Sequence, residues 1–180
     1  RRFSAFSSWV SISVGCNNTC TFCIVPTLRG VEKDRPMADV LTEVRTLVDQ
    51  GVIEITLLGQ NVNAYHGAWQ GAREWSLGRL IRELAEIEGL ERIRYMTSYP
   101  AEVDEDLISA HRDVPQLMPF LHLPVQSGSD KILKAMNRRH TSGDFRDIVE
   151  RLRIAQPQLA LSSDFIVGFP GETDADFNQT

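Results

Sequence analysis

Residues 8–23 read SWVSISVGCNNTCTFC, a stretch that joins a predicted strand to a cluster of cysteines. Its first half is rich in β-branched and aromatic residues, which predicts a strand that ends before Gly15. Its second half holds all three cysteines of the chain, Cys16, Cys20 and Cys23, in a C-x3-C-x2-C spacing. Such clustering cannot build a disulfide framework, so it indicates a metal or cluster site in a reducing compartment.

The cysteine spacing leaves two kinds of metal site open. A structural zinc site needs four ligands, and here the fourth would have to be a distant histidine such as His122. A four-iron cluster held by only three thiolates keeps one iron open for a cofactor or substrate. A three-cysteine loop directly after a strand favours the cluster.

The rest of the chain alternates between strand and helix patterns. Further apolar strands are predicted at residues 53–58, 92–97, 120–124 and 159–167. Apolar residues at helical spacing lie between them. Five strands joined by helices predict an α/β fold with a parallel sheet, which can be an open doubly wound sheet or a barrel. The polar segment 65–75 is expected to be a surface loop, and Thr173 with Asp176 is expected to cap a last helix.

The composition is that of a folded domain. The 180 residues are 42% hydrophobic and 24% charged, and no apolar run approaches the ~18 residues of a membrane helix. The net charge of −5 argues against this segment as the main nucleic-acid-binding surface. Because the sequence starts with Arg1 and ends inside a predicted helix, we expect it to be part of a longer protein.

Polar segments also follow three other predicted strands. These segments are Gly59-Gln60-Asn61, Gln126-Ser127-Gly128-Ser129 and DFIVGFPG at residues 164–171. Taken alone, the first is more typical of a helix-capping turn than of a binding site, and the third is more typical of an ordinary strand and turn. The second is as typical of a helix N-cap as of a binding site. Together with the cysteines they lie at the carboxyl ends of strands, where α/β sheets and barrels bind their ligands. Arg138 and Arg139 are typical of a solvated face, although one of them could neutralise a cofactor carboxylate. His66 and His140 are expected on the surface and His111 on a short helix without a partner, so none is assigned a catalytic role.

Four strings carry a family resemblance. CNNTCTFC resembles the C-x3-C-x-aromatic-C signature of the radical S-adenosylmethionine (SAM) superfamily. The strings LLGQNVNAY (57–65), FLHLPVQSGSD (120–130) and SSDFIVGFPGET (162–173) resemble the methylthiotransferases, in particular those that act on tRNA. The resemblance runs from about Trp9 to the C-terminal end. It implies an incomplete (βα)6 barrel, with residues 1–180 forming a truncated core of about five βα units. It also implies an N-terminal methylthiotransferase domain and a C-terminal TRAM-type RNA-binding domain outside this segment.

The resemblance also assigns roles to matching residues. Cys16, Cys20 and Cys23 would ligate a [4Fe–4S] cluster whose open iron chelates SAM. The residues that would contact SAM or shield the cluster are Phe22, Gly59, Gln60, Asn61, Gln126, Ser127, Arg138, Asp164, Val167 and Gly168. Asp34 stands where the family commonly has serine, so it receives no role.

The implied activity is addition of a methylthio group to C2 of N6-isopentenyladenosine next to the anticodon. SAM would be cleaved reductively to a 5′-deoxyadenosyl radical, which abstracts the hydrogen at C2, and a second [4Fe–4S] cluster on the N-terminal domain would supply sulfur. A second SAM would provide the methyl group. The implied partners are tRNA, held mainly by the other domains, and an electron donor such as flavodoxin or ferredoxin, in the cytoplasm and without a membrane. The alternatives are another tRNA adenosine or a ribosomal protein as substrate, or a zinc-stabilised binding module without catalysis.

Overall fold

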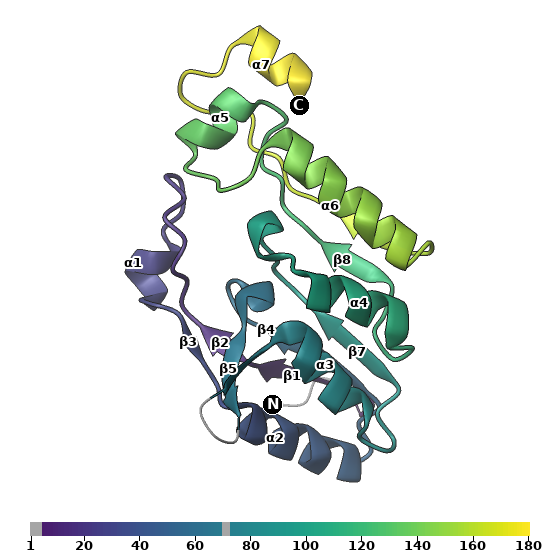
Figure 1. Cartoon of the computed structure of the whole chain (residues 1–180). Coiled ribbons are helices and arrows are strands. Elements are labelled where there is room, and N and C mark those ends of the chain that lie inside the picture. The colour runs from purple at the N-terminus through teal and green to yellow at the C-terminus, as the bar shows by residue number, and fades with distance from the viewer. Residues whose placement is uncertain (1–4, 70–72) are drawn as a thin grey trace.

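The computed structural model describes residues 5–69 and 73–180, and the strands of its main wall run parallel in chain order (Figure 1). The strands of the main wall are β1 (Ser7–Ser11), β4 (Glu54–Leu58), β7 (Arg92–Tyr95), β8 (Phe120–His122) and β9 (Ala160–Ser162). β1, β4 and β7 form one parallel sheet in that order, and β8 pairs in parallel with β9. A parallel bridge between Ile93 and Leu117 connects β7 to the residues just before β8. Neighbours in sequence are therefore neighbours in space, which is the order of a barrel wall and not of a doubly wound sheet.

The long helices pack against this wall. They are α2 (Met37–Asp49), α3 (Leu77–Ala85), α4 (Glu105–Asp113) and α6 (Ser142–Ala155). The shorter helices are α1 (Val25–Arg29), α5 (Asp130–Ala135) and α7 (Asp174–Gln179), and 3-10 turns lie at Val62–Ala64 and Pro100–Glu102. Each of the long helices contacts the next one along the chain, α2 with α3, α3 with α4 and α4 with α6. In Figure 1, α5 and α7 lie together at the opposite end of the molecule from α2.

Local sequence signals set the helix starts. Ser76 caps α3 by accepting a hydrogen bond from Arg79 N at 3.2 Å. Thr173 and Asp176 form the predicted capping box at the start of α7, because each side chain bonds the backbone N–H of the other residue. The expected last helix is therefore confirmed.

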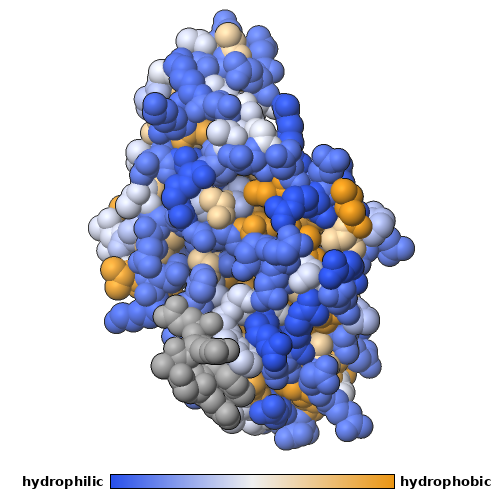
Figure 2. Space-filling view, in the orientation of Figure 1, coloured by the Kyte–Doolittle hydropathy of each residue, from blue (hydrophilic) through white to orange (hydrophobic). Residues whose placement is uncertain are grey.

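The core lies between the helices and the wall. Ile55, Leu57 and Ile93 of the central strands are fully buried, as are Leu80 and Ile81 on the inner face of α3. Alternate residues of β4 face the core, which gives its buried and half-buried alternation. The face shown in Figure 2 is largely hydrophilic, with hydrophobic side chains gathered over α6. No helix in the described part of the chain has the length and apolar composition needed to span a bilayer.

Two sequence predictions are corrected by backbone pairing. The predicted strand at residues 8–14 is broken at Ile12, whose N–H bonds Leu58 O at 2.9 Å while its C=O accepts from Arg35 N at 2.8 Å. Beyond Ile12 the chain leaves the wall as β2 (Ser13–Val14), which pairs antiparallel with β3 (Lys33–Asp34).

The expected surface loop at 65–75 is wrong where the segment is described, and its residues 70–72 lie outside the described residues. It contains the hairpin β5 (His66–Trp69) and β6 (Arg73–Ser76), preceded by a fully buried Tyr65 whose hydroxyl donates to Arg35 O at 2.8 Å. Gly67 is needed here because a Cβ at this position would overlap the Tyr65 hydroxyl. The glycines that suggested a loop thus serve close packing.

His111 is also placed differently from the sequence expectation. It lies on the short helix α4, as expected, but it is buried, and its Nε2 lies 2.7 Å from the hydroxyl of Tyr95 on β7. Burial lowers the pKa of His111 to about 4. His111 was expected to have no partner, but in the core it forms a hydrogen bond that links α4 to β7.

Replacing Ile55 with alanine is expected to lower the free energy of unfolding by about 2–5 kcal/mol, because it leaves a cavity beside the central strand. Urea denaturation of the two proteins measures this difference. The matched control is Ile154→Ala, where the side chain is 74% exposed and the change should stay within about 0.5 kcal/mol. Equal effects of both substitutions would contradict the position of the core.

Candidate functional site

The cysteine loop is held between two distant parts of the wall. On one side, Gly15 N donates to Gln60 Oε1 at 2.6 Å, so the start of the loop is tied to the end of β4. Gly15 has a φ of 86°, and a Cβ there would overlap Val31 O, so only glycine fits. On the other side, Thr21 N bonds Met136 O at 3.1 Å and Asn137 Nδ2 bonds Thr19 O at 3.0 Å. The loop is therefore fixed before any ligand binds.

All three cysteines face one cavity of 200 Å³ at the carboxyl ends of the strands. Its walls are Cys16, Asn18, Cys20, Phe22, Cys23, Val25, Gln60, Asn61, Thr97, Ser98, Tyr99, Pro124, Gln126 and Arg138. We call this the cysteine cavity. Eight of the residues to which the sequence assigned a cluster or cofactor role meet here, from segments that follow β2, β4 and β8 and from the start of the segment after α5.

Hydrogen-bond donors point at two of the sulfurs. Arg138 Nη1 lies 3.6 Å from Cys20 Sγ, and Asn18 N lies 3.4 Å from Cys16 Sγ. Burial raises the pKa of the Cys16 thiol, and the hydrogen bonds from Asn18 oppose that rise. Donors directed at sulfur stabilise the thiolate, which is the form that binds metals.

Tyr99 anchors Arg138 in this position. The Arg138 guanidinium stacks 4.1 Å from the centre of the Tyr99 ring, and its Nη2 donates to Pro124 O at 2.8 Å. Asn63 in turn fixes the Tyr99 backbone, accepting from its N–H at 2.8 Å and donating to its C=O at 2.9 Å.

The sequence analysis missed Thr97, Ser98 and Tyr99 as site residues. They follow β7, so the strand-end rule applied to the other segments would have found them.

Two cavity residues have unusual backbone angles. Thr97 has a φ of 71° and Gln126 a φ of 76°, a region that non-glycine residues rarely occupy and β-branched residues almost never. Val62 N bonds Thr97 O at 2.9 Å, and Ile166 N bonds Gln126 O at 2.8 Å. Such strain persists where the surrounding structure enforces it, and it clusters at functional sites.

Five predicted contact residues do not line the cysteine cavity, and a role for them in cofactor binding stays a prediction. Gly59 packs against Ser13, whose hydroxyl a Cβ would overlap. Ser127 is fully buried, and its Oγ accepts from Ser129 N at 3.1 Å. The exposed Asp164 lies 3.2 Å from His122 Nε2. Val167 is exposed, and the amide of Gly168 donates to the carboxylate of Glu172.

The histidine proposed as a zinc ligand is engaged elsewhere. His122 Nδ1 lies 2.8 Å from Ser162 Oγ, and its Nε2 faces Asp164. Across residues 5–69 and 73–180, no three His, Cys, Asp or Glu side chains converge as ligands of a single ion. His140, expected on the surface, is instead buried edge-on to Tyr99, with ring centres 5.9 Å apart. Burial and the charge of Arg138 lower the pKa of His140 to about 4.

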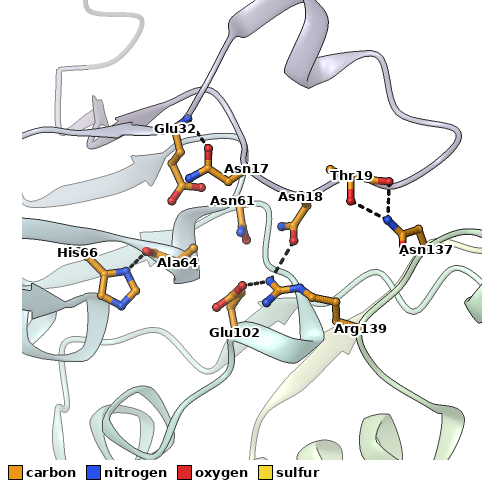
Figure 3. A pocket seen from close by; sticks show the side chains of 10 residues that line it. All are labelled: Asn17, Asn18, Thr19, Glu32, Asn61, Ala64, His66, Glu102, Asn137 and Arg139. Carbon is orange, nitrogen blue, oxygen red and sulfur yellow. Dashed lines mark hydrogen bonds and ion pairs between the residues drawn. The ribbon is translucent and has the colours of Figure 1, made fainter.

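A second cavity of 360 Å³ adjoins the first (Figure 3). Its walls are Asn17, Asn18, Thr19, Glu32, Asn61, Ala64, His66, Glu102, Asn137 and Arg139, and we call it the polar pocket. Asn18 and Asn61 line both cavities. Burial raises the pKa of Glu32 to about 7, and the carboxylates of Asp34 and Glu102 add to the rise.

Comparison with known proteins identifies one family and several solved structures with a similar fold. The model of the Radical SAM superfamily matches residues 10–180. The cobalamin-bound methyltransferase TsrM from Kitasatospora setae superimposes with a TM-score of 0.71 at 17% identity, covering 93% of this chain and 32% of TsrM. The cobalamin-dependent radical enzyme OxsB gives a TM-score of 0.69 at 14% identity over 95% of this chain and 25% of OxsB.

Methylornithine synthase (PylB) gives a TM-score of 0.57 at 16% identity over 91% of this chain and 45% of the synthase. At these identities the matches show the shared fold. The chain spans between a quarter and a half of the solved proteins that it matches.

The raised pKa of Glu32 has a consequence for stability. Between its ordinary pKa and about 7, the folded protein holds this proton while the unfolded chain has lost it, so stability falls as the pH rises through that range. Glu32→Gln removes this loss. We expect the variant to be more stable than the wild type at pH 8 and equal to it at pH 4, as measured by thermal melts. Glu88→Gln, at an exposed position, is the control, and a Glu32→Gln melt that shifts equally at both pH values would contradict the assignment.

Proposed function

Because the chain belongs to the radical SAM superfamily, we propose that it is the catalytic core of a tRNA methylthiotransferase. The reaction would add a methylthio group to C2 of N6-isopentenyladenosine next to the anticodon, as in the enzyme type called MiaB. The observation that carries the proposal is the cysteine cavity, in which Cys16, Cys20 and Cys23 meet Gln60 and Gln126. The strings around Gln60 and Gln126 are those that resemble the methylthiotransferases.

The residues present fit a [4Fe–4S] cluster. Three thiols face one cavity, and N–H donors from Arg138 and Asn18 are directed at Cys20 and Cys16. Hydrogen bonds to cluster sulfurs are among the means by which proteins set cluster potentials. When bound, the cluster supplies the electron that cleaves SAM to the 5′-deoxyadenosyl radical.

The amides of the cavity suit the polar part of SAM. Gln60 Oε1 already accepts from Gly15 N, so its NH2 group is left to donate to a carboxylate. Asn61 and Gln126 offer further donors and acceptors on the same wall. The positive charge of Arg138 favours the carboxylate of SAM and the thiolates alike.

Other side chains restrict water. Phe22 and Val25 form an apolar part of the wall, and Tyr99 is buried with its ring covered by Arg138. A site that excludes water strengthens every electrostatic interaction inside it and protects a reactive radical. The residues of this chain would thus position SAM, shield the radical from water and stabilise the thiolates and the SAM carboxylate electrostatically.

Cys20→Ala in the full-length protein is expected to abolish reductive cleavage of SAM, because it removes the thiolate that Arg138 faces. Bound iron should fall by about half, since the family resemblance implies two four-iron clusters. Thr27→Ala, an exposed position on the neighbouring helix α1, is the control and should retain both properties. A Cys20→Ala protein that still cleaves SAM, or a wild type that binds only zinc, would refute the radical core.

Nucleoside analysis of tRNA tests the substrate. In a strain lacking the gene, we expect N6-isopentenyladenosine to accumulate and its 2-methylthio derivative to disappear, with restoration by the wild type and not by Cys20→Ala. Loss of a different methylthio-nucleoside, or of a methylthio group on a ribosomal protein, would replace this substrate by another within the same enzyme class.

A further inference from the structure

The polar pocket lies beside the cysteine cavity, on the other side of Asn18 and Asn61. It contains no cysteine, and its 360 Å³ exceed the volume of the cysteine cavity. A ligand in the polar pocket would therefore lie next to a cofactor in the cysteine cavity without competing for the thiols. This is the relation that a radical enzyme needs between its cofactor and its acceptor.

Two hydrogen-bond acceptors in this pocket lack partners. Asn61 is 4% exposed, and its Oδ1 has no hydrogen-bond partner among the described residues. Figure 3 shows this side chain in the middle of the pocket. The Glu32 amide donates to Asn17 Oδ1 at 3.1 Å, but within the described chain its carboxylate makes no hydrogen bond or ion pair. A buried acceptor without a partner, such as Asn61 Oδ1, is costly, so a ligand that donates to it gains that free energy. The half-buried Glu32 carboxylate offers a second acceptor in the same pocket.

The cation of the pocket is already used. Arg139 Nη2 pairs with Glu102 and also donates to Asn18 Oδ1 at 2.9 Å. With Glu32 as a second carboxylate, the wall favours donor groups and disfavours phosphate. The available chemistry therefore suits hydroxyl and amino groups.

We propose that the polar pocket binds the acceptor nucleoside, with Glu32 and Asn61 accepting hydrogen bonds from its donor groups. This rests on the proposed function, which makes the acceptor an adenosine in RNA. Two parts of that nucleoside carry suitable donors, the ribose 2′-hydroxyl and the amino group at C6 of the base. Glu32 is the residue that distinguishes this pocket from the cofactor cavity, because Asn61 lines both.

The test measures RNA affinity and not turnover. Full-length protein with reconstituted clusters and SAM is titrated with a fluorescent anticodon stem-loop that carries N6-isopentenyladenosine at the target position. The titration is run at pH 8, where Glu32, with a pKa of about 7, is ionised. Glu32→Ala should then weaken binding about tenfold or more, as expected for a lost hydrogen bond to a charged group, and Glu32→Gln should weaken it less. SAM affinity, measured separately by equilibrium dialysis, should change less than about twofold.

Modified RNAs identify the donor group. If the ribose hydroxyl is the partner, the 2′-deoxy form of N6-isopentenyladenosine at the target weakens binding to wild type but causes no further loss in Glu32→Ala. If the N6–H is the partner, the same pattern is expected for N6-methyl-N6-isopentenyladenosine, which keeps the alkyl group but has no N–H. Glu88→Ala, an exposed glutamate away from both cavities, should bind as the wild type does.

The outcomes separate the two proposals. Unchanged RNA affinity in a folded Glu32→Ala protein, or losses from both RNA modifications that simply add to the Glu32→Ala loss, would overturn the pocket assignment while leaving the methylthiotransferase core intact. A wild type that cleaves SAM but binds no stem-loop would overturn the RNA substrate, and the pocket assignment with it.

Discussion

The site depends on two attachments of the cysteine loop, one at its start and one in its middle. One attachment is the hydrogen bond from Gly15 N to Gln60 Oε1, and the other is formed by Thr19 and Thr21 with Met136 and Asn137. Asn137, which is 118 residues from Thr19 in sequence, thereby helps to fix residues 16–23, which carry the three thiols. Without these bonds, an irregular loop of that length would have to lose its conformational entropy when a cluster binds. A preformed loop has lost it already during folding.

The second element of the site is the support of Arg138. A guanidinium directed at a sulfur is useful only if its position is fixed, and here the Tyr99 ring and Pro124 O hold it on two sides. Tyr99 is itself held by paired hydrogen bonds from Asn63, a residue of the segment after β4. Segments that follow three different strands, β4, β7 and β8, thus together hold the Arg138 guanidinium. The strained backbone at Thr97 lies at the start of the same segment and is maintained by Val62.

The two adjoining cavities differ in electrostatic character. In the cysteine cavity Arg138 forms no ion pair with another described residue and faces Cys20 Sγ, so its charge suits thiolates and the carboxylate of a zwitterion. In the polar pocket the cation Arg139 is paired with Glu102, and the carboxylate of Glu32 is left over. Asn18 and Asn61 form the shared wall. The cysteine cavity therefore suits an anionic group, whereas the adjoining polar pocket suits hydrogen-bond donors.

The sequence by itself determined the local features. Alternating apolar patterns predicted the parallel strands and helices, Thr173 and Asp176 predicted the last cap, and the clustered cysteines marked a loop that lines the cysteine cavity, because each signal is contained within a few neighbouring residues. The rule that ligands bind at strand ends also brought Gln60, Asn61, Gln126 and the cysteines together correctly. Side-chain direction was decided only by tertiary packing. Ser127 points into the protein, His140 and His111 are buried, and Tyr65 belongs to the core, because contacts with segments distant in sequence set their orientation. The polar pocket likewise exists only once the loops after β2, β4 and β7 and the segment after α5 have folded against one another, and no sequence spacing encodes that meeting.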